Sequence, residues 1–423
     1  MKNFPKKLIE IYKNSFIISR SSIVIVSSLF ASVFSYLFQF LSARSLSVEE
    51  YSELVSLFSL SVIIGTIMLV FTNGTTKLVA EIKSIDYPFR LSRFFFSLMK
   101  LVLVTTFFVF IGMIFFQKQI GAYLNIQNYK LIYIFAVAVV FGNINTALGP
   151  VLQGLQRFKA FSFYNIFNAF TKFLVALIVL YFSLTVIETF WGLVISTVLS
   201  IALGAFLLKK NLKLDLKAFD KVDIETLVKY SIGSILILAG LNFLQNNDVI
   251  LVKHYFDSNT AGIYASLTVI GRIIFFAASP VSIVMLPICA ERYKHGGDVV
   301  KPFLVSLSIS AFISLCGVFV YWLFPKLVIG ILFGQKYLVA EPYLPLFGAF
   351  MFVYTLLYLF GTFFISISKF KQGSLMLVGA IIQILGIHFF HENLYQVITI
   401  SIIATVISLF LFIPSLYKTI KNN

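Results

Sequence analysis

Charged residues are scarce in this chain of 423 residues. Asp, Glu, Lys and Arg together make up 12% of it, whereas hydrophobic residues make up 59%. Soluble domains average roughly 25% charged residues, so the composition excludes a soluble globular protein. Cysteine is almost absent, since Cys289 and Cys316 are the two in the chain. They suggest neither a disulfide framework nor a cysteine-based metal site.

Sequence signatures of an enzyme are also lacking. No GxxxxGK[ST] phosphate loop occurs, so we do not expect ATP hydrolysis by the chain itself. The four histidines are scattered and none has metal-ligand spacing with Cys or carboxylates. No pair of carboxylates lies deep in an apolar run, where acid–base chemistry on a bound sugar would need one. We therefore expect no metal and no cofactor.

Long apolar runs dominate the chain instead. A run of about 20 apolar residues is long enough to cross about 30 Å of hydrocarbon as a helix. The first run follows a basic segment without a small-residue cleavage site, so we expect no cleaved signal peptide. We predict an all-α polytopic membrane protein with about 12 transmembrane helices. The expected spans are 19–43, 51–73, 94–116, 130–153, 160–183, 188–208, 227–252, 261–288, 303–325, 343–366, 373–391 and 394–417.

The positive charges are distributed unevenly between the two sides of these spans. Of the 33 Lys and Arg residues, 24 fall on the N-terminal side of the membrane, 6 on the other side and 3 within spans. Cytoplasmic loops carry the excess of Lys and Arg in membrane proteins, so we expect both termini to be cytoplasmic. The net charge of +16 then needs no nucleic acid to explain it.

The sequence divides near its midpoint into two similar halves. The polar stretch 209–229 reads as a cytoplasmic linker between a six-helix half at 1–208 and a second at 230–423. "LSARSLSVEEYSELVSL" from residue 41 aligns with "LVKHYFDSNTAGIYASL" at an offset of 210, and "GPVLQGLQRFK" from residue 149 aligns with "GTFFISISKFK" at 212. Six spans per half make the repeat parallel. Transporters built in this way bind substrate near mid-membrane, between the halves.

Polar side chains recur at helical spacing on several of the expected spans. Serine and threonine on these stripes have an ordinary explanation, because they often hold membrane helices together. Amides in corresponding helices of both halves point more strongly to a wet cavity. The candidate substrate-binding amides are Gln39, Asn73, Asn168, Asn242 and Gln245.

Two cations lie near the middle of expected spans. Lys172 is about 18 Å along the fifth span and Arg272 is about 16 Å along the eighth, at 1.5 Å per residue. A charge at the centre of a membrane helix costs roughly 2.5–3.5 kcal/mol on insertion scales. Three explanations remain open: an ion pair between Asp248 and Arg272, snorkelling of Lys172 through its long stem, or a cationic cavity for an anionic substrate. We favour the cavity.

Several segments resemble polysaccharide transporters of the MOP flippase superfamily, most of all Wzx-type O-antigen flippases. The similar segments are "SLFASVFSYLFQFLSARSLSVEEYSELVSLFSL" from residue 28, "QGLQRFKAFSFYNIFNAFTK" from residue 153 and "AGIYASLTVIGRIIFFAASPVSIVMLPICAERYKHGGD" from residue 261. Each motif alone is loose, but the resemblance covers nearly the whole chain.

The resemblance implies a function in lipopolysaccharide biosynthesis at the bacterial cytoplasmic (inner) membrane. The expected substrate is an oligosaccharide on undecaprenyl pyrophosphate, flipped from the cytoplasmic to the outer leaflet by alternating access. Arg20, Lys172 and Arg272 would meet the pyrophosphate, and Asp248 is a candidate for coupling to a proton or sodium gradient. An O-antigen polymerase and a chain-length regulator are the expected protein partners.

Four alternatives remain. A multidrug exporter of the same superfamily should carry carboxylates rather than cations at mid-depth, and a lipid II flippase usually has extra spans. A non-transporting scaffold for glycan assembly stays open. An enzyme such as a polyprenyl-linked glycosyltransferase lacks its acidic site here.

Reporter fusions test the expected topology. Because of the distribution of Lys and Arg, a fusion in the 209–229 linker should be active as a cytoplasmic reporter. Fusions in the 117–130 and 326–342 loops should be active as outside reporters. A linker fusion that is active only on the outside would contradict the charge argument.

Overall fold

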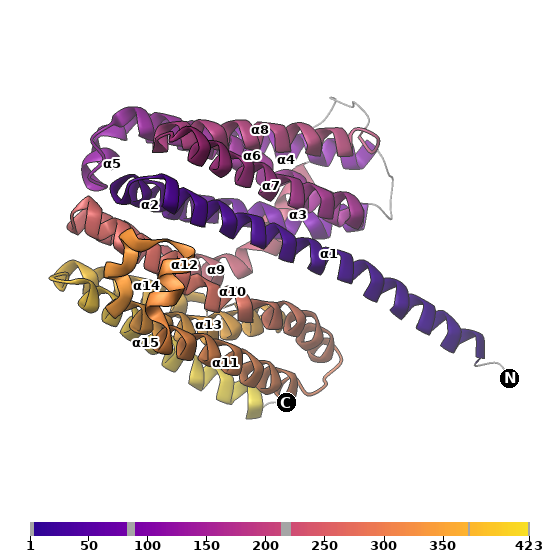
Figure 1. Ribbon diagram of the computed structural model, residues 1–423. Coiled ribbons are helices and arrows are strands. Elements are labelled where there is room, and N and C mark those ends of the chain that lie inside the picture. Colours follow the sequence, from indigo (N-terminus) through magenta and orange to yellow (C-terminus); the bar gives the residue numbers. More distant parts are fainter. Residues whose placement is uncertain (1–3, 83–88, 213–220, 371–372, 422–423) are drawn as a thin grey trace. The chain divides into compact units, whose positions relative to one another are not determined.

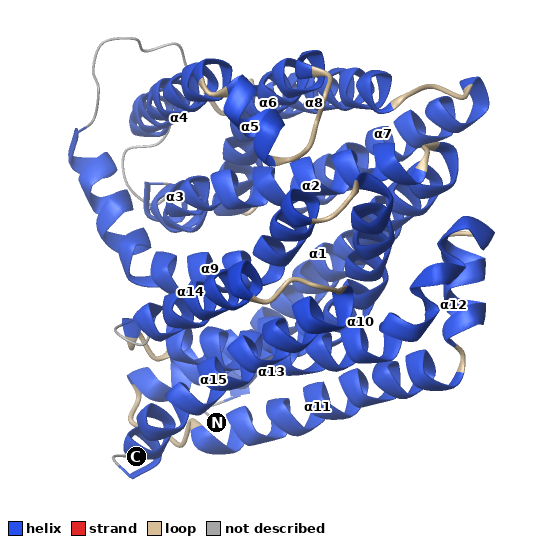
Figure 2. Cartoon of the chain, turned by 90° about the vertical axis from the view of Figure 1, so that its left-hand side faces the viewer, coloured by secondary structure: helices blue, strands red, loops and turns tan. Residues whose placement is uncertain are grey.

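The computed structural model describes residues 4–82, 89–212, 221–370 and 373–421. Every regular element within these ranges is a helix, as Figure 2 shows. Eleven helices of the described part are long and apolar enough to cross a membrane, and they coincide with eleven expected spans. The remaining expected span, 373–391, corresponds to a shorter apolar helix at Leu375–Phe389. The predicted all-α polytopic membrane fold is therefore confirmed.

The helices form two compact units that are not continuous in sequence. Unit 1 comprises Met1–Ser45, Phe71–Phe115 and Lys130–Val228, and unit 2 comprises Leu46–Val70, Phe116–Tyr129 and Lys229–Asn423. These boundaries differ from those of the halves at 1–208 and 230–423, because two short segments group with the C-terminal residues. The halves describe the sequence repeat and stay a prediction as domains.

Unit 1 is built around the packing of α7 against α1 and α8. Ser27 of α1 donates to Ser162 of α7 across 2.9 Å. Gly154 ends α6 in close contact with α3, since a Cβ at Gly154 would lie 2.7 Å from the carbonyl oxygen of Thr76. The helices mainly in this unit are α1 (Phe4–Ser45), α3 (Leu69–Ile82), α4 (Phe89–Phe115), α6 (Tyr129–Gly154), α7 (Phe158–Phe182) and α8 (Val186–Leu208).

Unit 2 is built around α13, which packs against α10, α11 and α15 (Figure 1). Phe347, Phe350 and Tyr354 of α13 are buried there. The elements mainly in this unit are α2 (Val48–Gly65), the 3₁₀ turn η1 (Thr66–Met68), α5 (Gln117–Tyr123), α9 (Lys221–Tyr255), α10 (Ser258–Lys294), α11 (Val300–Leu323), α12 (Pro325–Leu332), the 3₁₀ segment η2 (Gln335–Tyr343), α13 (Leu344–Ser366), α14 (Gly373–Phe389) and α15 (Leu394–Lys421).

The predicted linker 209–229 is only partly described. Residues 213–220 lie outside the described ranges, and α9 begins at Lys221. The end of the linker is therefore the first part of a 35-residue helix.

One repeated feature is the turn between α1 and α2, which recurs between α9 and α10. Ser47 caps α2 by accepting a hydrogen bond from the backbone N–H of Glu50, at 3.1 Å. Asp257, 210 positions later, caps α10 by accepting bonds from the N–H groups of Asn259 and Thr260. These bonds, first of all those from Thr260, hold the pKa of Asp257 below its ordinary value. Both caps satisfy helix-end donors that would otherwise lack partners.

A second repeated feature is the turn that ends α6 and α13. Gln156 and Ser368, 212 positions apart, both have φ of 56°. The next N–H group bonds five residues back in each case, from Arg157 to Leu152 and from Lys369 to Phe364. This is the Schellman pattern of helix termination, in which one left-handed residue lets the helix-end carbonyls find donors. The structure thus repeats both turns at the offsets found in the sequence.

The two copies of the first turn touch each other within unit 2. Asn259 donates to the carboxylate of Glu49, its counterpart 210 residues earlier, at 3.2 Å. Gly262 of α10 lies against α2, since an added Cβ would lie 2.1 Å from the carbonyl oxygen of Val48. The absence of a side chain at Gly262 is what permits this approach.

Lys253 is buried at this contact. Its side chain is 1% exposed, and its ammonium donates to the hydroxyls of Ser52 and Ser258 at 2.8 Å each. Lys253 follows the expected span 227–252 directly, and α9 continues to Tyr255 and includes it. The nearby carboxylates of Glu49 and Glu53 interact favourably with its charge.

Replacement of Gly262 by alanine should loosen the α2–α10 contact. The new Cβ has no room, and overpacking of this kind costs about 1–3 kcal/mol, so the purified protein should unfold at a lower temperature. The control is Gly112→Ala in α4, where nothing lies within 4 Å of an added Cβ. Equal melting temperatures for the two variants would contradict the close approach.

Candidate functional site

Helices α9 and α10 of unit 2 carry an interior polar cluster. We use this name for Asn242, Gln245, Asn246 and Asp248 of α9 together with Arg272 of α10. The Nη2 group of Arg272 donates to the backbone oxygen of Gln245 at 2.7 Å and to the side-chain oxygen of Asn246 at 3.1 Å. The guanidinium is thereby held against α9 by one of its two terminal nitrogens.

The cluster continues from α9 to the short 3₁₀ turn η1. The side-chain nitrogen of Asn246 donates to the carbonyl of Asn242 at 2.8 Å. Asn242 in turn donates to the hydroxyl of Thr66 at 3.1 Å. Thr66 lies where α2 has ended and α3 has not begun. A 3₁₀ turn within an expected span leaves irregular backbone, which needs polar partners inside a membrane.

Asp248 is fully buried but does not pair with Arg272. One carboxylate oxygen accepts a hydrogen bond from the hydroxyl of Tyr264 at 2.7 Å, and the other accepts from the N–H of Val249 at 2.9 Å. Arg272 bonds elsewhere on α9. A direct ion pair between Asp248 and Arg272, one of the three explanations for the deep charges, is therefore not what joins these helices.

Buried amide nitrogens beside the cluster have unused donors. Nε2 of Gln245 and Nδ2 of Asn247 are buried, and no acceptor for either lies among the described residues. Nε and Nη1 of Arg272 likewise bond to no described residue. Unpaired buried donors are costly, and donors of this kind on the helix that holds the Arg272 guanidinium suit an anionic or oxygen-rich ligand.

Unit 1 carries a second, smaller group on α7. Asn168 and Lys172 lie one turn apart, near the middle of this 25-residue helix. The side-chain oxygen of Asn168 accepts a bond from Ser200 of α8 at 3.3 Å. Lys172 is half-buried, and no described residue accepts a bond from its ammonium. An ammonium at this depth needs water or an anionic group within reach.

The other predicted site residues are less well described. The side chains of Arg20 on α1 and Asn73 on α3 lie outside the described part, and Gln39 is half-buried on α1. The structure therefore brings together Asn242, Gln245, Asp248 and Arg272 and places Asn168 and Lys172 on one helix. Their joint assignment as a substrate site stays a prediction.

Tyr264 is a member of this region that the analysis of charges and amides missed. Its hydroxyl is the donor that reaches the Asp248 carboxylate. The sequence signal is the Gly262-x-Tyr264 pattern in the segment from Ala261, one of the segments that resemble the transporters.

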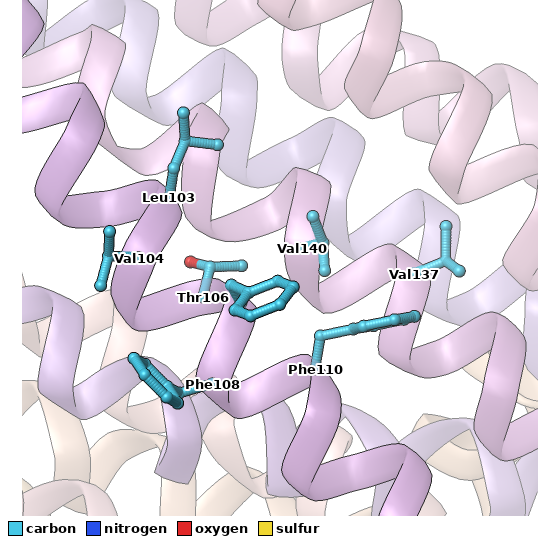
Figure 3. Close-up of a pocket in the computed structure, with 8 residues that line it drawn as sticks. Leu103, Val104, Thr106, Phe108, Phe110, Val137 and Val140 are labelled. Carbon is cyan, nitrogen blue, oxygen red and sulfur yellow. The ribbon is translucent and has the colours of Figure 1, made fainter.

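A cavity in unit 1 has a different character. It measures about 690 Å³ and lies between α4 and α6 (Figure 3). Phe108, Phe110, Val137 and Val140 surround it, and Phe108 is 68% exposed. Apolar side chains that are exposed on a membrane helix suit lipid chains rather than a charged group. Within the described residues, no group of three or more His, Cys, Asp or Glu side chains could hold a metal ion.

A family model described as polysaccharide biosynthesis protein matches residues 41–342, well over half of the chain. The chain belongs to this family. The uncharacterized membrane protein MJ1375 of Methanocaldococcus jannaschii is 25% identical over 285 residues, which are 62% of this chain and 65% of that protein. The match thus spans slightly less than two thirds of that relative's length.

Solved structures of the MOP superfamily share the fold of this polysaccharide biosynthesis protein. An inward-facing multidrug resistance MATE transporter has a TM-score of 0.75 at 12% identity, covering 92% of this chain and 94% of that one. The lipid II flippase MurJ has a TM-score of 0.73 at 14% identity, covering 93% and 87%. A MOP transporter from Pyrococcus furiosus, in which reversed polarity of the binding pocket suggests a different function, has 0.57 at 12%, with 95% of each chain covered. At such identities the likeness shows the fold alone.

Removal of the Tyr264 hydroxyl should destabilise unit 2. Tyr264→Phe takes a donor from a buried carboxylate, and hydrogen bonds to charged groups contribute about 1.5–3 kcal/mol. Tyr321→Phe is the matched control, since its hydroxyl donates to the neutral carbonyl of Ile270 at 2.6 Å and its loss should cost about 0.5–1.5 kcal/mol. Thermal unfolding of both variants checks that Tyr264→Phe loses more stability than Tyr321→Phe. A larger loss of stability in the Tyr321 variant would contradict the prediction.

Proposed function

We propose that this protein is a flippase for oligosaccharides carried on a polyprenyl pyrophosphate, of the O-antigen or a related surface polysaccharide. It would move the lipid-linked unit from the cytoplasmic to the outer leaflet by alternating access. The family match and the shared transporter fold support this choice. The main observation behind the proposal is that the two deep cations, Lys172 and Arg272, keep hydrogen-bond donors that no described residue uses.

Both cations lie far from the helix ends. Lys172 and Arg272 are each 14 residues after the first residue of their helix, which is about 21 Å at 1.5 Å per residue. Lys172 has no described partner, and Arg272 uses one nitrogen of three. The fold therefore leaves most of their hydrogen-bonding capacity unused.

The repeat supports the proposal, because the counterparts of these charges in the other half are apolar. At the offsets of the two repeated turns, Lys172 corresponds to Ile384 and Arg272 to Val62. An apolar side chain is thus accepted at the equivalent helical position in the other copy. A charge that costs several kcal/mol to keep at depth, and that the fold can replace by hydrocarbon, is best explained by a ligand.

A pyrophosphate head group has the chemistry that these side chains fit. It carries negative charge through hydrocarbon and must be met by cations and N–H donors at depth. Arginine offers a planar fork and lysine a compact point charge. The amide donors beside Arg272 could bind phosphate or sugar oxygens. The polyprenyl tail would stay in lipid.

Asp248 is the residue we assign to ion coupling, with a proton or sodium gradient driving the return of the empty carrier. Its carboxylate is buried and bonded to Tyr264. At the offset of 210 its counterpart is Phe38, so the carboxylate is not part of the repeat. We also propose that an O-antigen polymerase and a chain-length regulator act beside the flippase.

The relatives suggest two other substrates. Cationic drugs should be met by carboxylates at mid-depth, whereas two of the three deep charges here are cations. Lipid II shares the polyprenyl pyrophosphate, so the deep cations suit it as well. The match to polysaccharide biosynthesis proteins favours a surface glycan.

Charge reversal tests the proposal. In a flippase-deleted strain with matched protein levels, Lys172→Glu and Arg272→Glu should abolish surface polysaccharide, because each places a negative charge where the pyrophosphate passes. Lys172→Arg should keep partial export, and Arg272→Lys should keep more than Arg272→Ala.

The control is Lys301→Glu, which reverses an exposed charge near the start of α11 and should export normally. Full export by both deep glutamate variants would show that the cations do not serve the substrate. Rescue of a lipid II flippase depletion, or of drug sensitivity, by the wild-type gene would indicate one of the other substrates.

A further inference from the structure

The turn between α6 and α7 in unit 1 opens onto a polar cavity. It measures about 380 Å³ and is lined by Ile23, Gln156, Arg157, Phe158, Lys159 and Ala160. Ligand pockets in proteins begin at about 300 Å³, so this cavity would hold a head group but not a whole oligosaccharide. Two of its lining side chains are cations and none is acidic.

Arg157 serves both the fold and the cavity. Its Nη1 group donates to the carbonyl of Leu207 and to the side chain of Asn211, the latter at 2.6 Å. These bonds satisfy the C-terminal end of α8, where carbonyls lack helical partners. Nε and Nη2 of Arg157 bond to no described residue, so most of the guanidinium fork stays available.

The second half of the chain shows what the fold alone requires at this position. Lys369 occupies the equivalent place, 212 residues later, after a turn with the same φ of 56°. Its ammonium donates to Thr419 near the end of α15, at 2.8 Å, and Thr419 is itself 212 residues after Leu207. A lysine is therefore sufficient to tie this turn to the last helix of its half. The additional donors of arginine in the first half are not explained by that task.

We infer that the cavity at the α6–α7 turn binds a diphosphate head group. The free edge of the Arg157 guanidinium matches two phosphate oxygens, and Lys159 adds a second positive charge at the rim. Lys159 is exposed, as a group that captures a ligand from the membrane surface must be.

The place of the cavity fits a loading site for the substrate. It lies at a helix end, on the side that the distribution of Lys and Arg predicts to be cytoplasmic. Its wall on α1 is Ile23, and Arg20 precedes Ile23 by one helical turn. The choice of a polyprenyl diphosphate as ligand rests on the proposed function. The inference that the cavity binds phosphate groups rests on its two cations instead.

Binding to the purified full-length protein in phosphatidylcholine nanodiscs tests the inference. The probes are a polyprenyl diphosphate, inorganic pyrophosphate and phosphatidylglycerol. The polyprenyl diphosphate should bind, and Arg157→Lys should weaken it about tenfold, because the fork is lost while the tie to α8 is kept, as Lys369 keeps it to α15. Lys159→Gln should weaken it too.

The matched control is Lys369→Arg, which makes the reverse exchange at the equivalent turn and should leave binding unchanged. Melting temperatures near the wild-type value in all three variants would show that the fold is intact. Equal binding by Arg157→Lys and wild type, or no binding by wild type, would overturn the inference. Equal competition by phosphatidylglycerol would do so as well, since any anionic lipid would then suffice.

Inorganic pyrophosphate separates the two sources of a diphosphate. Weak binding of the free ion is expected if the ligand is a lipid, and equally tight binding would overturn the assignment to a lipid head group. The outcome is independent of transport. Binding that depends on Arg157, without any export of glycan, would refute the proposed function and leave this site in place. Glycan export by the wild type, together with unchanged binding in Arg157→Lys, would refute this site and leave the proposed function in place.

Discussion

The need to give every backbone polar group a partner is the constraint on which this structure depends. Inside hydrocarbon a helix meets that need along its length, and where it ends, its last carbonyls and first N–H groups need partners of another kind. The chain solves this twice in the same way. Ser47 and Asp257 cap two helices, and Gln156 and Ser368 let two others end in a left-handed turn. Many different apolar residues can form a lipid-facing helix surface, whereas a helix end needs particular hydrogen-bond donors or acceptors. The sequence repeat is accordingly detectable at the turns and faint between them.

The same contrast explains how much could be predicted from the sequence. Apolar length alone predicted the spans, because a helix that crosses a bilayer has few other requirements. The offsets of 210 and 212 predicted two turns that the structure repeats, the first as a capped helix start and the second with the same backbone hydrogen bonds. The partners of buried polar groups could not be predicted: the bond from Tyr264 to Asp248 joins two helices, and nothing in the spacing selects Tyr264 over Arg272 as that partner. The burial of Lys253 was missed because α9 extends beyond its apolar run. The grouping of 46–70 with the C-terminal residues depends on packing at Gly262, which is a matter of tertiary contact.

The described residues satisfy the charges of Lys253, Arg272 and Lys172 to different degrees. Lys253 donates to two serine hydroxyls and lies near carboxylates, so its charge is matched by the protein. Arg272 is held by one nitrogen, and Lys172 by no described group. Since a buried charge without a partner is costly, the unmatched part of each side chain is a measure of what a ligand would have to supply. The described residues thus satisfy Lys253 best and Lys172 least, and Arg272 lies between them.

A duplicated chain also separates what the fold needs from what function needs. Where both copies hold the same bond, as at the two helix-ending turns, the shared atoms are explained by folding. Where the copies differ, the contacts of the residue decide whether it serves the fold: Lys253, whose counterpart is Ala43, donates to two serine hydroxyls. Phe38, Val62 and Ile384 stand where Asp248, Arg272 and Lys172 would be expected by symmetry, and each is accommodated. Because Lys172 and two nitrogens of Arg272 also lack described partners, we propose that these two charges serve a ligand. Asymmetry between the halves, rather than depth or charge alone, is the stronger reason to look for a ligand at these positions.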